Sequence, residues 1–395
     1  SPSIGTRIEN AFFGGFDWFL RGLNWLGIAR PALNAGLRVA AAGNDDEWYD
    51  AMADHAGTML EAEYTERPGR KTYSERVKEY LAEAKANTRF AELSEPTAFH
   101  NAEFIEELEE VGDAKFVGGN HVEYLIDGPQ SFAKRAELID NAQESIHLLT
   151  WTIYDDPTGR DLCERLVKKA KEGVDVRVIL DRNIAARSAH IKTLKYLEDN
   201  GIEVIRWEDP EHTQWGNHCK MMVVDGVKSV AGGMNPGDYY SHGWHANPDY
   251  DGPKWRDTDV YTHGPAGVDQ EALFVRYWNS QVMRQSLDLE PISMDRAKLL
   301  DRAGQPGSSR IAVVDHLPGD ERYDVYSTMM KAVSGATKSI EIENAYFLTL
   351  PGMNELIHAA LERGVRVRIY TNSNKSVDEP LVSEPIMKSL PDLHE

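Results

Sequence analysis

The sequence predicts an α/β protein with two related α/β lobes that follow an N-terminal helical region. Between residues 121 and 207, short apolar runs alternate with segments of helical periodicity, a pattern typical of strands joined by crossover helices. A similar alternation returns after residue 339, which indicates an internal duplication. Residues 45–110 are instead rich in helix formers and contain few β-branched residues. We therefore expect a helical region over residues 1–115, a first lobe over 116–285 and the start of a second lobe over 286–395.

An aromatic stretch, Phe12–Leu26, lies within the N-terminal region. Its aromatic and leucine side chains are interspersed with arginines, as in amphipathic segments that lie in a bilayer interface. Most such stripes are packed against the rest of their own protein, and we favour that interpretation. A peripheral membrane contact through this stretch is the alternative.

The first lobe is predicted from its periodicity to contain buried strands that alternate with helices. The expected strands cover residues 122–126, 145–154, 174–180 and 202–207, and the expected helices cover 131–142, 159–171 and 191–200. Apolar runs on both sides of Asp225-Gly226 then predict a hairpin, because Asp-Gly between such runs is a strong turn signal.

His218 and Lys220 precede this turn, and their spacing places them on one face of the expected strand. An imidazole beside a fixed cation suits attack on phosphorus, because the ammonium offsets the negative charge of a phosphate. Asp225 has the opposite parity and lies at the turn, so we do not expect it to join the pair directly. Cys219 also faces the other way, and we interpret it as a packing residue.

The segment after the turn adds groups suited to holding a phosphate. Gly232 and Gly233 allow the backbone to approach a ligand closely, and Asn235 can donate an amide hydrogen bond to a phosphate oxygen. The full spacing is His-x-Lys, four residues, Asp, six residues and Gly-Gly-x-Asn. It resembles the motif of the phospholipase D superfamily, in which a serine often stands where Gly233 does here. The alternative, an ordinary hairpin with a core histidine and a surface lysine, is disfavoured because the whole spacing is present.

The resemblance covers roughly residues 120–380 and implies phosphodiester chemistry that needs no metal and no other cofactor. In the family, one motif histidine attacks phosphorus to form a phosphohistidine, and a second protonates the leaving alcohol and then activates water or an acceptor alcohol. The resemblance implies the catalytic residues His218 (as nucleophile), Lys220 and Asp225, and the phosphate-binding residues Asn235, Gly232 and Gly233.

Five further polar residues are weaker candidates for a supporting role. Asp257 or Asp259 lies in the stretch that leads into the last strand of the first lobe and would orient the motif histidine, although turn capping explains either equally well. Tyr154, Glu343 and Asn344 lie at the ends of buried strands in equivalent places of the two lobes. Ordinary strand-end polar residues are the alternative for these three.

The duplication is visible as two matched pairs of strands. Residues 145–151 correspond to 339–345, and residues 173–179 correspond to 364–370, with intervals of 28 and 25 residues between the paired starts. Family members carry one His-x-Lys motif per lobe, and the second would fall beyond Glu395. The resemblance thus implies duplicated lobes, the second incomplete, and a C-terminal piece with the second His-x-Lys as partner. The alternative is a dimer in which two copies of His218 meet.

Composition limits the classes of partner and substrate. The net charge of −21 argues against a nucleic-acid partner, which would require a basic surface. No uninterrupted apolar run reaches the roughly 18 residues of a membrane-spanning helix, so we expect a soluble or peripheral protein. The two cysteines leave the compartment open. We expect a phospholipid substrate, with a phosphodiesterase acting on nucleic-acid ends and a non-catalytic binding scaffold as the alternatives.

Overall fold

The computed structural model describes residues 102–185, 191–209, 216–316, 324–347, 353–373 and 375–377. The aromatic stretch Phe12–Leu26 and nearly all of the expected N-terminal helical region lie outside the described residues. The chain divides into two compact units, one over Asp113–Asp315 and one that combines residues up to Gly112 with those from His316 onward. None of the described helices is long and apolar enough to cross a bilayer.

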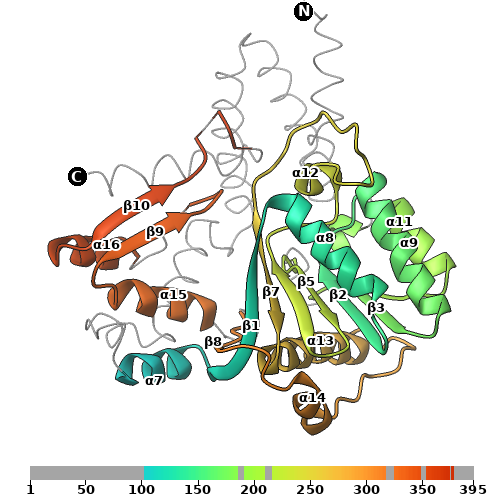
Figure 1. The fold of residues 1–395 in the computed structure, drawn as a ribbon, viewed down its shortest axis with the longest axis horizontal. Helices are drawn as coiled ribbons and strands as arrows, with labels where there is room; N and C mark the ends of the chain where they lie inside the picture. The colour runs from blue at the N-terminus through green and yellow to red at the C-terminus, as the bar shows by residue number, and fades with distance from the viewer. Residues whose placement is uncertain are drawn as a thin grey trace, which may run out of the picture. The chain divides into compact units, whose positions relative to one another are not determined.

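The unit Asp113–Asp315 contains an eight-stranded mixed sheet in the order β4-β3-β2-β5-β6-β7-β1-β8 (Figure 1). Its strands are β1 (Val117–Ile126), β2 (Ser145–Thr150), β3 (Asp175–Asp181), β4 (Glu203–Trp207), β5 (Met221–Val224), β6 (Lys228–Gly232), β7 (Thr258–His263) and β8 (Ser309–Ile311). The expected parallel pairing is found among β2, β3 and β4, and all other neighbours pair antiparallel. β1 departs from the prediction, because it pairs with β7 and β8 rather than with β2 across the helix that joins them.

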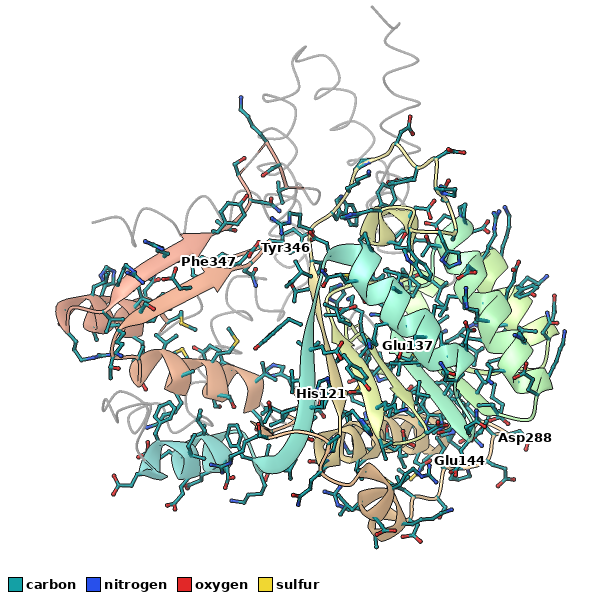
Figure 2. The ribbon with its side chains drawn as sticks, viewed as in Figure 1. His121, Glu137, Glu144, Asp288, Tyr346 and Phe347 are labelled. Atoms are coloured by element: carbon teal, nitrogen blue, oxygen red, sulfur yellow. The ribbon has the colours of Figure 1, made fainter. Side chains whose placement is uncertain are left out.

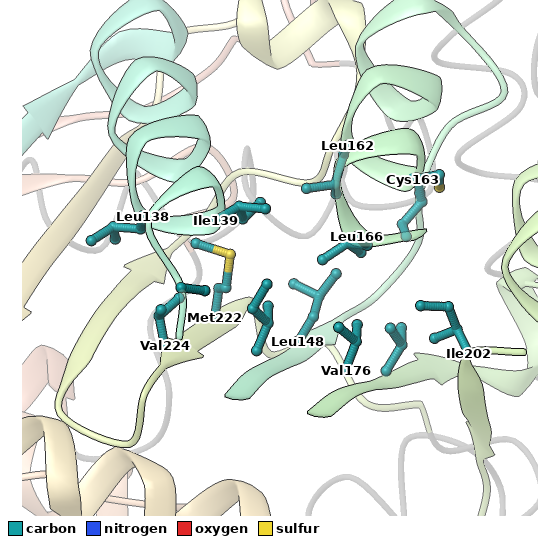
Figure 3. Packing of buried hydrophobic residues seen from close by; sticks show 14 of the residues in the cluster. Leu138, Ile139, Leu148, Leu162, Cys163, Leu166, Val176, Ile202, Met222 and Val224 are labelled. Carbon is teal, nitrogen blue, oxygen red and sulfur yellow. The ribbon is translucent and has the colours of Figure 1, made fainter. Parts of the chain in front are cut away.

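Helices cover both faces of this sheet. They are α8 (Asp127–Asp140), α9 (Pro157–Lys171), α10 (Arg182–Ala185), α11 (Ile191–Asp199), α12 (Asp238–Ser241), α13 (Pro265–Arg284) and α14 (Arg296–Ala303). One apolar cluster fills the space between α8, α9, α11 and the sheet, and Leu148, Leu166 and Met222 lie near its centre (Figure 3). Alternate residues of β2 point into this cluster and away from it, as the period of a strand requires.

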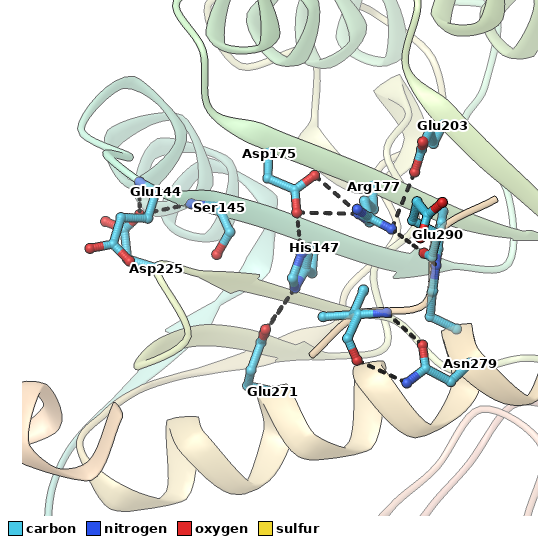
Figure 4. Close-up of polar contacts among 12 residues, drawn as sticks. Glu144, Ser145, His147, Asp175, Arg177, Glu203, Asp225, Glu271, Asn279 and Glu290 are labelled. Carbon is cyan, nitrogen blue, oxygen red and sulfur yellow. Dashed lines mark hydrogen bonds and ion pairs between the residues drawn. The ribbon is translucent and has the colours of Figure 1, made fainter. Parts of the chain in front are cut away.

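The other face of the sheet packs on α13 through a buried polar network (Figure 4). His147 stacks on Phe274 with ring centroids 4.6 Å apart, and its Nδ1 lies 2.8 Å from the Glu271 carboxylate. Its Nε2 lies 3.7 Å from Asp175, an ion-pair distance rather than a hydrogen bond. Burial alone would lower the pKa of His147, but the Asp175 and Glu271 carboxylates outweigh it and raise the pKa to about 9. The network therefore contains a charged histidine at neutral pH.

Residues 286–315, which sequence analysis assigned to the second lobe, include α14 and β8. Arg302 of α14 donates a 2.9 Å hydrogen bond to the carbonyl of Asp225 and lies 2.6 Å from the Glu144 carboxylate. Leu299 packs against an apolar cluster that contains Val227. These contacts join α14 to the hairpin of the first lobe.

The second unit repeats the start of the first. It contains α7 (Ala102–Val111), α15 (Asp324–Ser334), β9 (Ser339–Glu343), α16 (Met353–Glu362) and β10 (Arg366–Tyr370), with β9 and β10 paired in parallel as β2 and β3 are. Gly173 and Gly364 end corresponding helices with φ of 93° and 82°. The hydrogen bond from Asp175 N to Glu144 O has its counterpart from Arg366 N to Lys338 O. The predicted duplication of α/β lobes is therefore found in the backbone geometry.

Candidate active site

The β5–β6 hairpin positions the His-x-Lys segment. Asp225 and Gly226 both have positive φ, at 52° and 69°, as a two-residue turn of the predicted type requires. The sequence predicted that His218 and Lys220 lie on the strand itself. They instead precede it, because β5 begins at Met221. One further ladder bond, 3.1 Å from Gly232 N to Lys220 O, fixes the end of the segment next to the sheet.

The side chains of His218 and Lys220 meet at Trp151, the residue that follows β2. The rings of His218 and Trp151 pack edge to face with centroids 5.1 Å apart, and the ammonium of Lys220 lies 5.7 Å from the same indole ring. Lys220 is only 5% exposed and donates a 2.7 Å hydrogen bond to the carbonyl of His218. The structure therefore brings the predicted pair together.

This environment perturbs both groups. His218 is exposed as a residue, but its ring packs against Trp151. Burial, together with the Lys220 ammonium, lowers the pKa of the imidazole to about 4. Burial lowers the pKa of Lys220 to about 8, although nearby acidic groups, including Asp257 and Asp181, favour its charged form. At pH 7 the imidazole is neutral and the lysine is mostly charged. A neutral imidazole beside an ammonium is the state that attack on a phosphodiester requires.

Asp181 holds the start of the motif segment. It is a buried carboxylate at the end of β3, and its Oδ2 accepts a 2.9 Å hydrogen bond from the backbone N–H of Asn217. Its Oδ1 accepts from the N–H of Ile184 at 3.2 Å. A side chain on Gly216 would collide with Asp181, since its Cβ would lie 2.8 Å from Oδ2. Asp181 thus sets the path of the backbone one residue before His218.

Gly232, the last residue of β6, and Gly233, which follows it, make room for carboxylates of β7 and of the segment that precedes β7. A Cβ on Gly232 would lie 2.6 Å from the carbonyl of Thr258 and would also collide with Asp259. A Cβ on Gly233 would lie 2.7 Å from Cγ of Asp257. Burial raises the pKa of Asp257, and the neighbouring Asp259 adds to the shift. Close approach of these acids to the backbone is therefore the structural reason for both glycines.

Asn235 is fully buried at the end of this loop. Its Oδ1 accepts a 3.3 Å hydrogen bond from the hydroxyl of Thr150, and its amide donates to the hydroxyl of Tyr240 at 3.4 Å. The side-chain amide has a second N–H, and this is the group that could donate a hydrogen bond to a phosphate.

Asp225 is not brought to the His218–Lys220 pair. Its carboxylate accepts hydrogen bonds from the backbone N–H groups of Gln143, Glu144 and Ser145, at 2.7–3.3 Å, at the start of β2. Figure 4 shows the contacts with Glu144 and Ser145. Asp225 therefore links the hairpin turn to the start of β2 through hydrogen bonds.

The weaker candidates come from both units. Tyr154 follows β2 and packs edge to face on Tyr239, with ring centroids 6.1 Å apart. Glu343 ends β9 and is exposed, and the neighbouring Asn344 accepts a 2.9 Å hydrogen bond from the N–H of Tyr346. Asp259 contacts Arg135 at 2.8 Å, and no contact between Asp259 and His218 is found among the described residues.

Comparison with known proteins gives the family. Residues 136–240, which include the whole His-x-Lys to Gly-Gly-x-Asn segment, match the family described as "Cardiolipin synthase, PLD-like domain". The cardiolipin synthase of Listeria welshimeri is 28% identical over 257 residues, which cover 63% of this chain and 51% of that protein. The major cardiolipin synthase ClsA of Bacillus subtilis is 27% identical over 288 residues, which cover 71% of this chain and 57% of that protein. The chain carries a phospholipase D-like domain over residues 136–240.

A solved structure has a similar fold. The phosphatidylserine synthase of Haemophilus influenzae is 17% identical, with a TM-score of 0.51 over 70% of this chain and 67% of that chain. The chain spans about half the length of the curated relatives it matches, at 51% and 57%.

Three residues of the phospholipase D-like site were not identified from the sequence. Trp151 and Asp181 each stand at the carboxyl end of a buried parallel strand, a position where ligand-binding residues gather in α/β sheets, and that signal was available. Arg135 lies in the middle of a predicted helix, and no local pattern distinguishes it from a surface arginine.

Proposed function

We propose that the chain carries one half of the active site of an enzyme that transfers the phosphatidyl group of a phospholipid to an acceptor alcohol. The observation that carries the proposal is the neutral imidazole of His218 held beside the Lys220 ammonium within the phospholipase D-like region. The name of the matched relatives, cardiolipin synthase, favours transfer to an alcohol over transfer to water. Phosphatidylglycerol is the substrate we propose, since cardiolipin consists of two phosphatidyl groups on one glycerol.

In the proposed reaction, a ring nitrogen of His218 attacks phosphorus, and the bond from phosphorus to the oxygen of the leaving alcohol breaks. A second histidine donates the proton that this alcohol takes. Lys220 and the free amide N–H of Asn235 offset the charge on the phosphate oxygens. The second histidine then removes the proton of the acceptor alcohol, whose oxygen attacks phosphorus and releases His218 from the phosphohistidine.

The second histidine is proposed to come from a second His-x-Lys motif in the remainder of the full-length protein. This accords with the duplicated β9-α16-β10 unit and with the coverage of about half of the matched relatives, 51% and 57%. A dimer in which two copies of His218 meet is the alternative. Native and denaturing mass measurement separates the two, because a homodimer that is active with no further motif would exclude a second His-x-Lys.

The test uses full-length protein and vesicles of phosphatidylglycerol. We expect release of glycerol with formation of cardiolipin, and a loss of several orders of magnitude in rate for His218→Ala. The matched control is His121→Ala, since His121 is exposed on β1 and pairs with Glu123 at 2.8 Å (Figure 2). Mass analysis of rapidly quenched enzyme should detect the phosphatidyl adduct on the peptide that contains His218.

Three results would refute the proposal. A folded His218→Ala variant with normal turnover would remove His218 from the chemistry. Cleavage of short DNA without any turnover of phospholipid would favour the nuclease alternative, and absence of turnover on both would favour a binding scaffold.

A further inference from the structure

A buried ion pair lies behind the loop of residues 232–235. Arg135 of α8 and Asp259 of β7 approach to 2.8 Å, with side-chain exposures of 3% and 0%. The hydroxyl of Ser131 donates to Asp259 and accepts a 3.1 Å hydrogen bond from Nε of Arg135. Each charged group therefore has several partners, as a buried ion pair requires if it is to be tolerated.

The pair holds both polar groups of the Met234 backbone. Asp259 Oδ1 accepts from the N–H of Met234 at 3.4 Å, and Arg135 Nη2 donates to the carbonyl of Met234 at 3.3 Å. The carbonyl belongs to the same peptide plane as the N–H of Asn235. Fixing the orientation of that peptide plane therefore restricts the direction in which the side chain of Asn235 points.

The loop needs an external support, because Gly232 and Gly233 carry no side chains that could pack and restrict it. Gly232 also allows Asp259 to approach the loop, since any side chain at position 232 would collide with Asp259. Met234 is the fully buried apolar side chain of the loop. The ion pair supplies the directional contacts that the glycines cannot supply.

We propose that Arg135 and Asp259 are positioning residues that act through Met234 to aim Asn235 at the phosphate. This rests on the proposed function, in which Asn235 donates to a phosphate oxygen. The pair has no net charge, so it orders the loop without adding a charge that would repel the phosphate or compete with Lys220 for it.

The central variant is Arg135→Lys, because an ammonium can keep the ion pair but cannot reach Asp259, Ser131 and Met234 together. In full-length protein we expect kcat to fall at least tenfold with little change in KM, since a misaimed group loses contacts in the transition state. Arg165→Lys is the matched control, because Arg165 of α9 also bridges two carboxylates, Asp140 and Asp161, and should keep wild-type kcat.

A double-mutant cycle separates aiming from general loss of structure. If Arg135 acts through Asn235, then Arg135→Lys should lower kcat by less than twofold in an Asn235→Ala background. Equal losses in both backgrounds would show that Arg135 supports the fold without aiming Asn235, and would overturn the proposal.

A third measurement does not depend on activity. Replacing the pair by Arg135→Met with Asp259→Leu leaves no unpaired charge, so the variant should fold. Hydrogen exchange at the amides of Met234 and Asn235 should then rise at least tenfold, while exchange in β2 and β3 stays as in the wild type. Unchanged exchange would show that the ion pair does not hold the loop and would overturn this proposal. Absence of phosphodiester turnover by the wild type would refute the proposed function, and the exchange measurement does not depend on that turnover.

Discussion

The pKa values of His218 and Lys220 define the pH range in which the proposed half-site works. The nucleophile must be neutral, which the imidazole is above its pKa of about 4, and Lys220 must be charged, which it is below its pKa of about 8. We therefore expect kcat/KM to be flat near neutral pH and to fall about tenfold per pH unit well above pH 8. The shift of Lys220 from 10.5 to about 8 corresponds to about 3 kcal/mol against its charged form. Because this pKa is lowered, that cost to the folded state is present below pH 8 and fades between pH 8 and 10.5.

The assay is the hydrolysis of a soluble chromogenic phosphodiester by full-length protein across this range. Lys220→Arg identifies the group responsible for the alkaline fall, because a guanidinium keeps its proton at every pH used. We expect a lower plateau and no fall near pH 8 in this variant. The control Lys228→Arg, at the far end of the hairpin on β6, should keep the wild-type profile. The reasoning fails if Lys220→Arg falls at the same pH as the wild type.

Three further predictions concern the support of the site and of the sheet. Asp225→Ala should lower the free energy of unfolding, measured in urea, by about 1–3 kcal/mol, because the substitution leaves backbone N–H groups at the start of β2 without their acceptor. We expect kcat to stay unchanged. A folded but inactive variant would show that Asp225 takes part in catalysis. Since the pKa of His147 is raised from 6.5 to about 9, its stabilisation should be full below pH 6.5 and disappear as the pH rises through 9. Urea titrations should show this slope in the wild type and not in His147→Gln. Gly232→Ala should cost about 1–3 kcal/mol by overpacking. Gly118→Ala should cost almost nothing, because its Cβ would have only one neighbour, at 3.9 Å.

Local pattern was sufficient for the order of strands and helices from β2 to β6, because burial on both faces imposes clear apolar runs. It also placed His218 and Lys220 close together, since they are two residues apart in the chain, although the strand on which that prediction relied begins only at Met221. The partner of β1 was missed, because pairing with β7 is decided by contacts between segments far apart in the chain. The packing of Gly232 against Asp259 was missed for the same reason. The spacing of the motif is local, but the carboxylate of Asp259 that requires the glycine comes from β7.

The ion pair of Arg135 and Asp259 joins residues 124 positions apart, which affects how the lobe is completed during synthesis. At about 5–20 residues per second, Asp259 leaves the ribosome roughly 6–25 s after Arg135. Until then the guanidinium of Arg135 lacks the carboxylate of Asp259. Packing α8 onto the sheet at that stage would bury an unpaired charge, which is costly. We expect the nascent lobe to keep this flank open until β7 arrives. The His-x-Lys segment is thus translated before β7, and the loop of residues 232–235 gains the support of the ion pair only after β7 has been added.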